Sequence, residues 1–252
     1  MGAYTSGQGH HDDVWNSDDG GISWNEVTSS AGWAGRTYHS CVVFNDMLYV
    51  LGGKRSSVVY NDVWTSVDGG SSRTLVTAAA DWSARRSQVA VVYNDKIFVM
   101  GGSNSLYLND IWNSEDGINW SEVSAAAAWS GRRFHTSVVH NDKIYVMGGQ
   151  ISSSSGSAGR TSDMWYSSNG GVDWMEHASD VLWDARATHS SVVFNDHIYV
   201  IGGDDNEVWS LEDKPIILSS NPATRIQKNV GCAFIGVQVG LIGLISAYWF
   251  GK

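Results

Sequence analysis

Four arginines recur along the chain at a nearly constant spacing, and they are the clearest candidates for ligand chemistry. They are Arg36, Arg85, Arg132 and Arg186. A guanidinium carries a permanent charge and a planar fork of donors, so it binds a carboxylate or a phosphate through two parallel hydrogen bonds. A ring of these groups would therefore bind an anionic ligand. The alternative, which we favour, is that each arginine pairs with an aspartate of a neighbouring repeat and stabilises the fold.

Three of the eight histidines share one position of the repeat, namely His39, His135 and His189, and Gln88 takes that position in the second unit. A residue that recurs once per unit is more often architectural than a ligand. The sequence contains no CxxC, HxxxH or HExxH spacing that would indicate a metal site. We therefore predict no metal, no cofactor and no catalytic residue.

Residues that break a repeat are better candidates for function, because they are not needed to satisfy the repeated fold. The longest interruption runs from Ile151 to Asp163 and contains Arg160. Lys54 and Arg55 occupy the same loop in the first unit. Variable loops on one face of a rigid scaffold commonly form a binding surface. We predict that these loops bind a protein partner.

The repeat itself predicts the elements that position these residues. In each unit an apolar, β-branched run such as HSCVVF is followed by an Asn-Asp pair and a second run that ends in Gly-Gly. Asn and Asp tolerate the positive φ of a tight hairpin turn, so the two runs predict paired strands. An Asp-Val-Trp segment and a Trp-x-x-Val segment predict a third and a fourth strand. Sheets this small must stack around an axis to bury both faces.

The units resemble kelch repeats, with the pattern R-x-x-H-S-x-V-V, then N-D-x-I-Y-V-x-G-G, then a downstream Trp, over residues 12–213. The turn between the third and fourth strands resembles the Asp-box of sialidase-type propellers. In the first copy Ser17, Asp19, Gly21 and Ser23 match, followed by Trp24. The resemblance implies an all-β, kelch-like β-propeller of four to five blades over residues 1–213. Partial blades at the two ends could close the ring by pairing with each other, and an incomplete ring is the alternative.

Charge is unevenly distributed along the 252 residues. All 26 acidic residues lie at or before Asp213, so the body carries −14 and the tail +4. An acidic body argues against nucleic-acid binding, which needs clustered lysines and arginines. Cys41 and Cys232 lie in different kinds of segment, so a disulfide framework is not expected.

The tail predicts membrane attachment. Residues 214–229 form a polar linker, and residues 230–250 contain no charge and are long enough for a transmembrane helix. Arg225 and Lys228 on the near side favour a single-pass, tail-anchored protein with a cytosolic propeller. A GPI-anchored protein at the cell surface is the alternative. Gly236 and Gly240 have the spacing that lets two membrane helices pack, but we do not favour a homodimer.

Together these features predict a non-catalytic propeller that binds a protein partner and is held at a membrane. One alternative is a glycan-binding or sugar-processing propeller, because sialidases and sialic-acid mutarotases have related folds. A sugar-processing enzyme would need an acidic side chain with a raised pKa facing the arginines. The other alternative is a fragment of a larger kelch protein.

Overall fold

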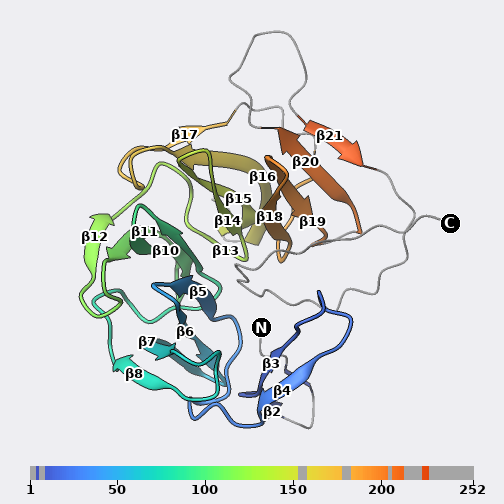
Figure 1. The fold of residues 1–252 in the computed structure, drawn as a ribbon. Coiled ribbons are helices and arrows are strands. Elements are labelled where there is room, and N and C mark those ends of the chain that lie inside the picture. The colour runs from blue at the N-terminus through green and yellow to red at the C-terminus, as the bar shows by residue number, and fades with distance from the viewer. Residues whose placement is uncertain are drawn as a thin grey trace, which may run out of the picture.

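The computed structural model describes residues 4–5, 9–152, 158–177, 183–203, 206–212 and 223–226. All regular structure in these ranges is β. The sheets follow one another about a common centre (Figure 1). Within the described residues no helix is long and apolar enough to cross a membrane. The predicted membrane segment 230–250 lies outside these ranges, as does most of the predicted linker.

The described chain contains four sheets of four or more strands. The first comprises β5 (Ser40–Phe44), β6 (Met47–Arg55), β7 (Val58–Ser66) and β8 (Thr74–Thr77); the second, β9 (Val89–Tyr93), β10 (Lys96–Ser103), β11 (Tyr107–Ser114) and β12 (Ser121–Ser124). The third comprises β13 (Arg132–Arg133), β14 (Thr136–His140), β15 (Lys143–Ser152), β16 (Ala158–Ser167) and β17 (Met175–Glu176); the fourth, β18 (Ser190–Phe194), β19 (His197–Ile201), β20 (Val208–Glu212) and β21 (Ala223–Ile226).

Two smaller units precede these sheets. Strands β1 (Tyr4–Thr5) and β2 (Gly9–His10) pair with each other. Strands β3 (Val14–Asn16) and β4 (Asn25–Thr28) form the hairpin that we call the half-blade, because they correspond to the third and fourth strands of a complete sheet. The half-blade lies between the fourth and the first sheets (Figure 1). The predicted pairing of the two partial ends is not what the described residues show, because β19 pairs with β20 and β3 pairs with β4.

The predicted strand order within a unit is confirmed. Each complete sheet is an antiparallel meander with the VV-containing strand innermost, and β5, β9, β14 and β18 lie side by side in that order. The Asn-Asp turns have the expected positive φ, for example 48° at Asn45 and 60° at Asp46. The structure differs at residues 223–226, which were predicted to be linker. They pair with β20 because Ala223–Ile226 extends along its open edge.

The core lies between the sheets. One cluster joins Val42 and Phe44 of the first sheet to Ile97 and Val99 of the second, and the pattern repeats at the next two interfaces. Strand two of each sheet therefore covers the face of the sheet before it. Burying such aliphatic side chains stabilises each interface by about 2 kcal/mol per residue, so the stack of sheets depends on its neighbours.

A series of backbone hydrogen bonds runs around the centre at one end of the sheets. The Ser87 N–H donates to the Tyr38 carbonyl at 2.8 Å, the Phe134 N–H to Ser87 at 3.3 Å, and the Thr188 N–H to Phe134 at 3.0 Å. All four residues have positive φ, between 55° and 60°. At each of these residues the strained conformation turns the backbone so that successive sheets are joined at this end.

Candidate functional site

The repeated arginines lie in the protein interior, and three of them are fully paired. Arg36 is 1% exposed. Its Nη1 and Nη2 donate to Oδ1 and Oδ2 of Asp62 at 2.6 and 2.9 Å, and Nη1 also donates to the Gly52 carbonyl at 2.9 Å. The equivalent bidentate pairs are Arg85–Asp110, at 2.7 and 2.6 Å, and Arg132–Asp163, at 2.7 Å for both bonds.

Each of these aspartates is the Asp of the Asp-Val-Trp type segment, as the favoured interpretation expected. The structure corrects one detail, because the pair forms within one sheet and not between neighbours. The arginine precedes strand one and the aspartate lies on strand three of the same sheet, so the pair closes across strand two. Bidentate pairing uses the donors that a ligand would need. This geometry supports a structural role for Arg36, Arg85 and Arg132.

The pKa shifts of the paired aspartates agree with this role. Burial raises the pKa of Asp110, but the hydrogen bonds and charge of Arg85 outweigh burial and leave that pKa below its usual value. In the same way, Arg132 leaves the pKa of Asp163 below its usual value despite burial. The carboxylates are therefore held ionised by their guanidinium partners.

The fourth arginine is held differently. Arg186 donates from Nη1 to the Gly202 carbonyl at 3.0 Å, while its Nη2 lies 3.7 Å from Oε2 of Glu207. Glu207 occupies the position of the aspartates in the other sheets. The longer carboxylate side chain gives a looser ion pair than the 2.6 to 2.7 Å contacts elsewhere.

The repeated histidine position joins adjacent sheets. Gln88 donates from Nε2 to the Leu51 carbonyl of the preceding sheet at 2.8 Å. His135 and His189 occupy the equivalent position and are each 1% exposed, but their ring nitrogens have no hydrogen-bond partner among the described residues. Burial lowers the pKa of His189 to about 4, so its ring is neutral at neutral pH. Within the described ranges no group of three or more His, Cys, Asp or Glu could hold a metal ion.

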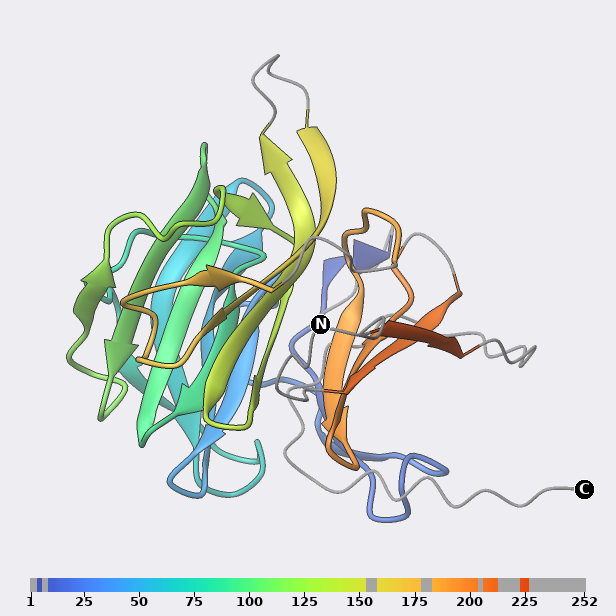
Figure 2. The same cartoon turned by 90° about the horizontal axis from the view of Figure 1, so that it is seen from above.

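The loop residues predicted to bind a partner lie at the end of the sheets that carries the hairpins between strands two and three. Arg55 and Arg160 are exposed, on the first and third sheets respectively. Lys54 is half-buried, and its backbone pairs with Thr37. Figure 2 shows the β15–β16 hairpin, which carries Arg160, extending beyond the other sheets. We call this end the loop face.

Sequence reasoning missed an aromatic and cationic cluster on the loop face. The Arg133 guanidinium lies 4.8 Å from the ring centroid of Tyr107 and 5.0 Å from that of Phe134. Its Nε donates to Oε1 of Gln150 at 2.8 Å, which fixes the side chain. Phe134 in turn meets Tyr38 edge to face, with centroids 5.4 Å apart. The signal available in the sequence was the second arginine of the doublet Arg132-Arg133.

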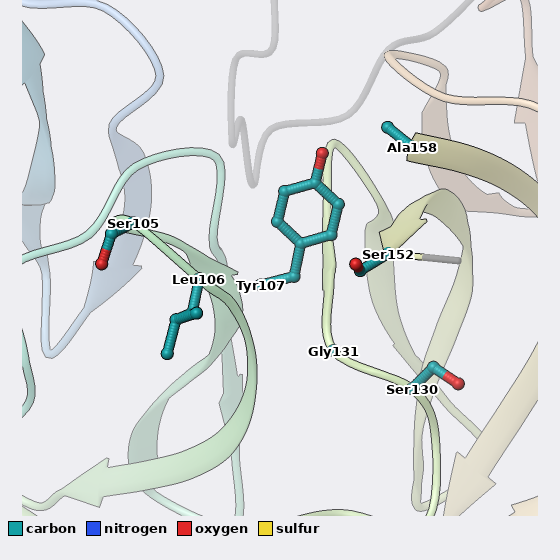
Figure 3. A pocket seen from close by; sticks show the side chains of 7 residues that line it. All are labelled: Ser105, Leu106, Tyr107, Ser130, Gly131, Ser152 and Ala158. Atoms are coloured by element: carbon teal, nitrogen blue, oxygen red, sulfur yellow. The ribbon is translucent and has the colours of Figure 1, made fainter. Parts of the chain in front are cut away.

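A cavity of about 430 Å³ lies beside this cluster. It lies between the second and third sheets and is lined by Ser105, Leu106, Tyr107, Ser130, Gly131, Ser152 and Ala158. Figure 3 shows the Tyr107 ring between the loops of the two sheets, with its hydroxyl directed towards Ala158. Leu106 is 69% exposed at the rim. The lining of the cavity combines hydroxyl, aliphatic and aromatic groups.

The opposite end of the sheets is acidic and locally bonded. It carries the Asn-Asp turns and the turns between strands three and four. In the first of the latter, Asp19 accepts hydrogen bonds from Ser23 Oγ at 2.6 Å and from the Ile22 N–H at 3.0 Å. The hydrogen bonds from Ser23 lower the pKa of Asp19 to about 2. The Asp19 carboxylate is therefore committed to its own turn.

Radial four-stranded sheets, buried Arg–Asp pairs and loops gathered at one end define a kelch-type β-propeller. The KLHDC2/KLHL20/DRC7 Kelch-repeats domain matches residues 2–149, and the Kelch motif matches residues 185–215. The chain belongs to the KLHDC2/KLHL20/DRC7 kelch-repeat family, because the first match covers more than half of it. A search of curated proteins gave no match.

Proposed function

We propose that this chain is a non-catalytic protein-interaction module that binds its partner through the loop face. Kelch repeats suggest such a module. The observation that carries the proposal is the cluster formed by Arg133, Tyr107 and Phe134 beside the cavity. Tyr and Arg side chains at the centre of an interface supply much of the binding free energy.

The pairing of the interior arginines supports the same proposal. A sugar-processing propeller would use central guanidinium groups to bind a carboxylate. Arg36, Arg85 and Arg132 are instead engaged by the aspartates of their own sheets. We propose also that the turns resembling Asp-boxes are structural, because the Asp19 carboxylate bonds groups of its own turn.

Two variants on the loop face test the main proposal. Partners captured by crosslinking to the full chain are quantified by mass spectrometry for wild type, Tyr107→Ala and Arg133→Ala. Loss of one interface anchor is expected to reduce capture of a specific partner by about tenfold or more. Lys96→Ala is the matched control, because Lys96 lies at the opposite end of the second sheet and pairs only with exposed Glu115 in the described structure. Equal capture by all four proteins would reject the loop face as the binding surface.

The membrane tether is a separate proposal and rests on the sequence alone. The 21 uncharged residues from 230 to 250 suit a single membrane span that leaves the propeller in the cytosol. Leu241→Arg with Leu244→Arg should convert a membrane-bound protein into one released by carbonate extraction, because each charge opposes insertion by about 3 kcal/mol. Release of wild type under the same conditions would contradict the tether. A GPI anchor would be revealed by release with a phosphoinositide-specific lipase.

A further inference from the structure

Two adjacent lysine or arginine residues occur three times in the sequence, at 54–55, 85–86 and 132–133. The first serine or threonine after the second pair is Ser87, and the first after the third pair is Thr136. These are 8% and 3% exposed, so an enzyme cannot reach their hydroxyl groups. After the first pair, by contrast, Ser56 and Ser57 are both exposed. Burial therefore singles out the first pair as the one that precedes accessible hydroxyl groups.

These serines form the tip of the β6–β7 hairpin on the loop face. Strands β6 and β7 pair as far as Arg55, which lies opposite Val58, and leave Ser56 and Ser57 as a two-residue turn. Ser56 has a positive φ of 51°. Arg55 is exposed, and Val58 is 53% exposed. The turn and both of its neighbours are therefore accessible from solvent.

Ser57 has the surroundings of an acceptor for a kinase that selects cations. Lys54, which is half-buried, and exposed Arg55 lie three and two residues before it, and apolar Val58 follows it. Carboxylates in the substrate groove of such an enzyme pair with the preceding cations, and charge patterns of this kind determine which substrates a kinase selects. Within the described residues the Ser57 hydroxyl makes no hydrogen bond. No contact of this hydroxyl has to be broken before it can react.

The second sheet offers a natural contrast on the same face. Its β10–β11 hairpin carries Ser105, which is exposed and is followed by exposed, apolar Leu106. The three residues before Ser105 carry no charge. Ser105 and Ser57 thus share their place in a hairpin, their exposure and an apolar neighbour. They differ in the preceding cations.

The tip of the β6–β7 hairpin lies outside the packed core. Beyond the bulge at the Gly pair, three residue pairs join β6 to β7, and the Ser56 N–H donates to Nε2 of His10 at 3.0 Å. Exposed loop tips with small polar residues open locally at a low cost in free energy. Opening of this tip would present residues 54–58 to an enzyme as a continuous segment.

We propose that Ser57 is a phosphorylation site for a protein kinase that selects cations before the acceptor. The Ser57 Oγ attacks the γ-phosphorus of ATP, its proton passes to the catalytic aspartate of the kinase, and ADP leaves with the bridging oxygen. The phosphoserine carries a charge of about −1.5 to −2 at neutral pH. The hairpin, which bears two cations, then becomes close to neutral. Phosphorylation therefore changes the charge of the loop face.

The test uses the full chain in mild detergent, ATP and the catalytic subunit of cyclic-AMP-dependent protein kinase, an enzyme of this class. Mass spectrometry locates the phosphate. We expect phosphate at Ser57 and about tenfold less or lower at Ser105. Arg55→Gln should lower kcat/KM at Ser57 by about tenfold or more, because one charge-assisted pair is lost. Lys96→Gln, at the opposite end of the sheets, should be modified like wild type.

A synthetic peptide of residues 50–62 separates recognition of the sequence from access in the fold. Phosphate on the peptide but not on the full chain would show that the fold protects Ser57. Phosphate on neither would show that the sequence is not recognised. Either result would overturn the proposal, as would equal rates for wild type and Arg55→Gln. The reaction needs no partner, so its outcome is independent of the binding proposed for the loop face.

Discussion

The first three sheets and the half-blade carry similar third-strand sequences in different surroundings. In the sheets, the strand is covered on both edges and its aspartate is closed by a buried arginine at 2.6 to 2.9 Å. In the half-blade the same Asp and Trp are exposed. The fourth sheet is intermediate, with Arg186 3.7 Å from Glu207. The comparison shows that the buried Arg–Asp pair is a feature of the first three sheets, in which the arginine precedes strand one of the sheet that carries the aspartate.

The largest expected effect is removal of one aspartate from a complete sheet. Asp163→Ala leaves the Arg132 guanidinium, which is 0% exposed, without its carboxylate. Breaking a buried pair in this way costs about 3–5 kcal/mol. Urea unfolding followed by tryptophan fluorescence measures the loss.

The half-blade supplies the matched control for that variant. Asp13→Ala should change the free energy of unfolding by less than about 0.5 kcal/mol, because exposed substitutions rarely exceed that. Similar losses at Asp13 and Asp163 would abolish the distinction between the half-blade and the sheets.

A second comparison uses tryptophans. Trp129 is 1% exposed and meets Trp174 edge to face, with ring centroids 5.8 Å apart. Trp129→Ala should cost about 3–5 kcal/mol by chemical denaturation. Trp24→Ala in the half-blade, where the side chain is 49% exposed, should cost less than about 1 kcal/mol. A Trp24 effect as large as that of Trp129 would show that the half-blade has a core of its own.

The smallest expected effect concerns acid sensitivity. Burial lowers the pKa of His189 from 6.5 to about 4, so the unfolded chain takes up a proton that the folded protein excludes. This contribution to stability is fully present above the unfolded pKa of 6.5 and is lost as pH falls towards 4.

His189→Gln isolates that contribution, because Gln88 fills the equivalent position and bonds the preceding sheet at 2.8 Å. The variant should lose less stability than wild type between about pH 7 and about pH 5, measured as the urea midpoint. An unchanged pH dependence would mean that the pKa of His189 is the same in the folded and the unfolded protein.

Much of the fold could be predicted from the sequence because each repeat contains the same turn residues and the same apolar strand pattern. The Asn-Asp turns mark the hairpin between strands one and two by their positive φ, and alternating valines mark the inner strand. The Gly pairs were wrongly expected to end strand two, because in the first three sheets that strand continues through them with a bulge. The favoured interpretation, that the arginines pair with aspartates, was also correct, although each pair forms within one sheet. Strand β21 was missed because ATRI is only four residues long and lacks the Trp-x-x-Val pattern expected of a fourth strand.

The candidate site was less predictable, since it depends on contacts between loops of different sheets. Arg133 of the third sheet contacts Tyr107 of the second sheet. The spacing of residues within one repeat cannot predict a contact between two sheets. The contact made by Arg73 was also not predicted from the sequence. It replaces a tryptophan of the repeat, and its guanidinium lies 4.9 Å from the Trp33 ring, where the other sheets have an edge-to-face tryptophan pair.

The most direct test asks whether partner binding depends on the loop face or on the interior arginines. Arg132→Met combined with Asp163→Leu removes a buried pair in favour of apolar side chains, which proteins often tolerate without loss of stability. Partner capture by this folded double variant is compared with capture by Tyr107→Ala. We predict that the double variant captures the partner like wild type and that Tyr107→Ala loses it by about tenfold. Loss in the folded double variant, with capture retained by Tyr107→Ala, would contradict the account.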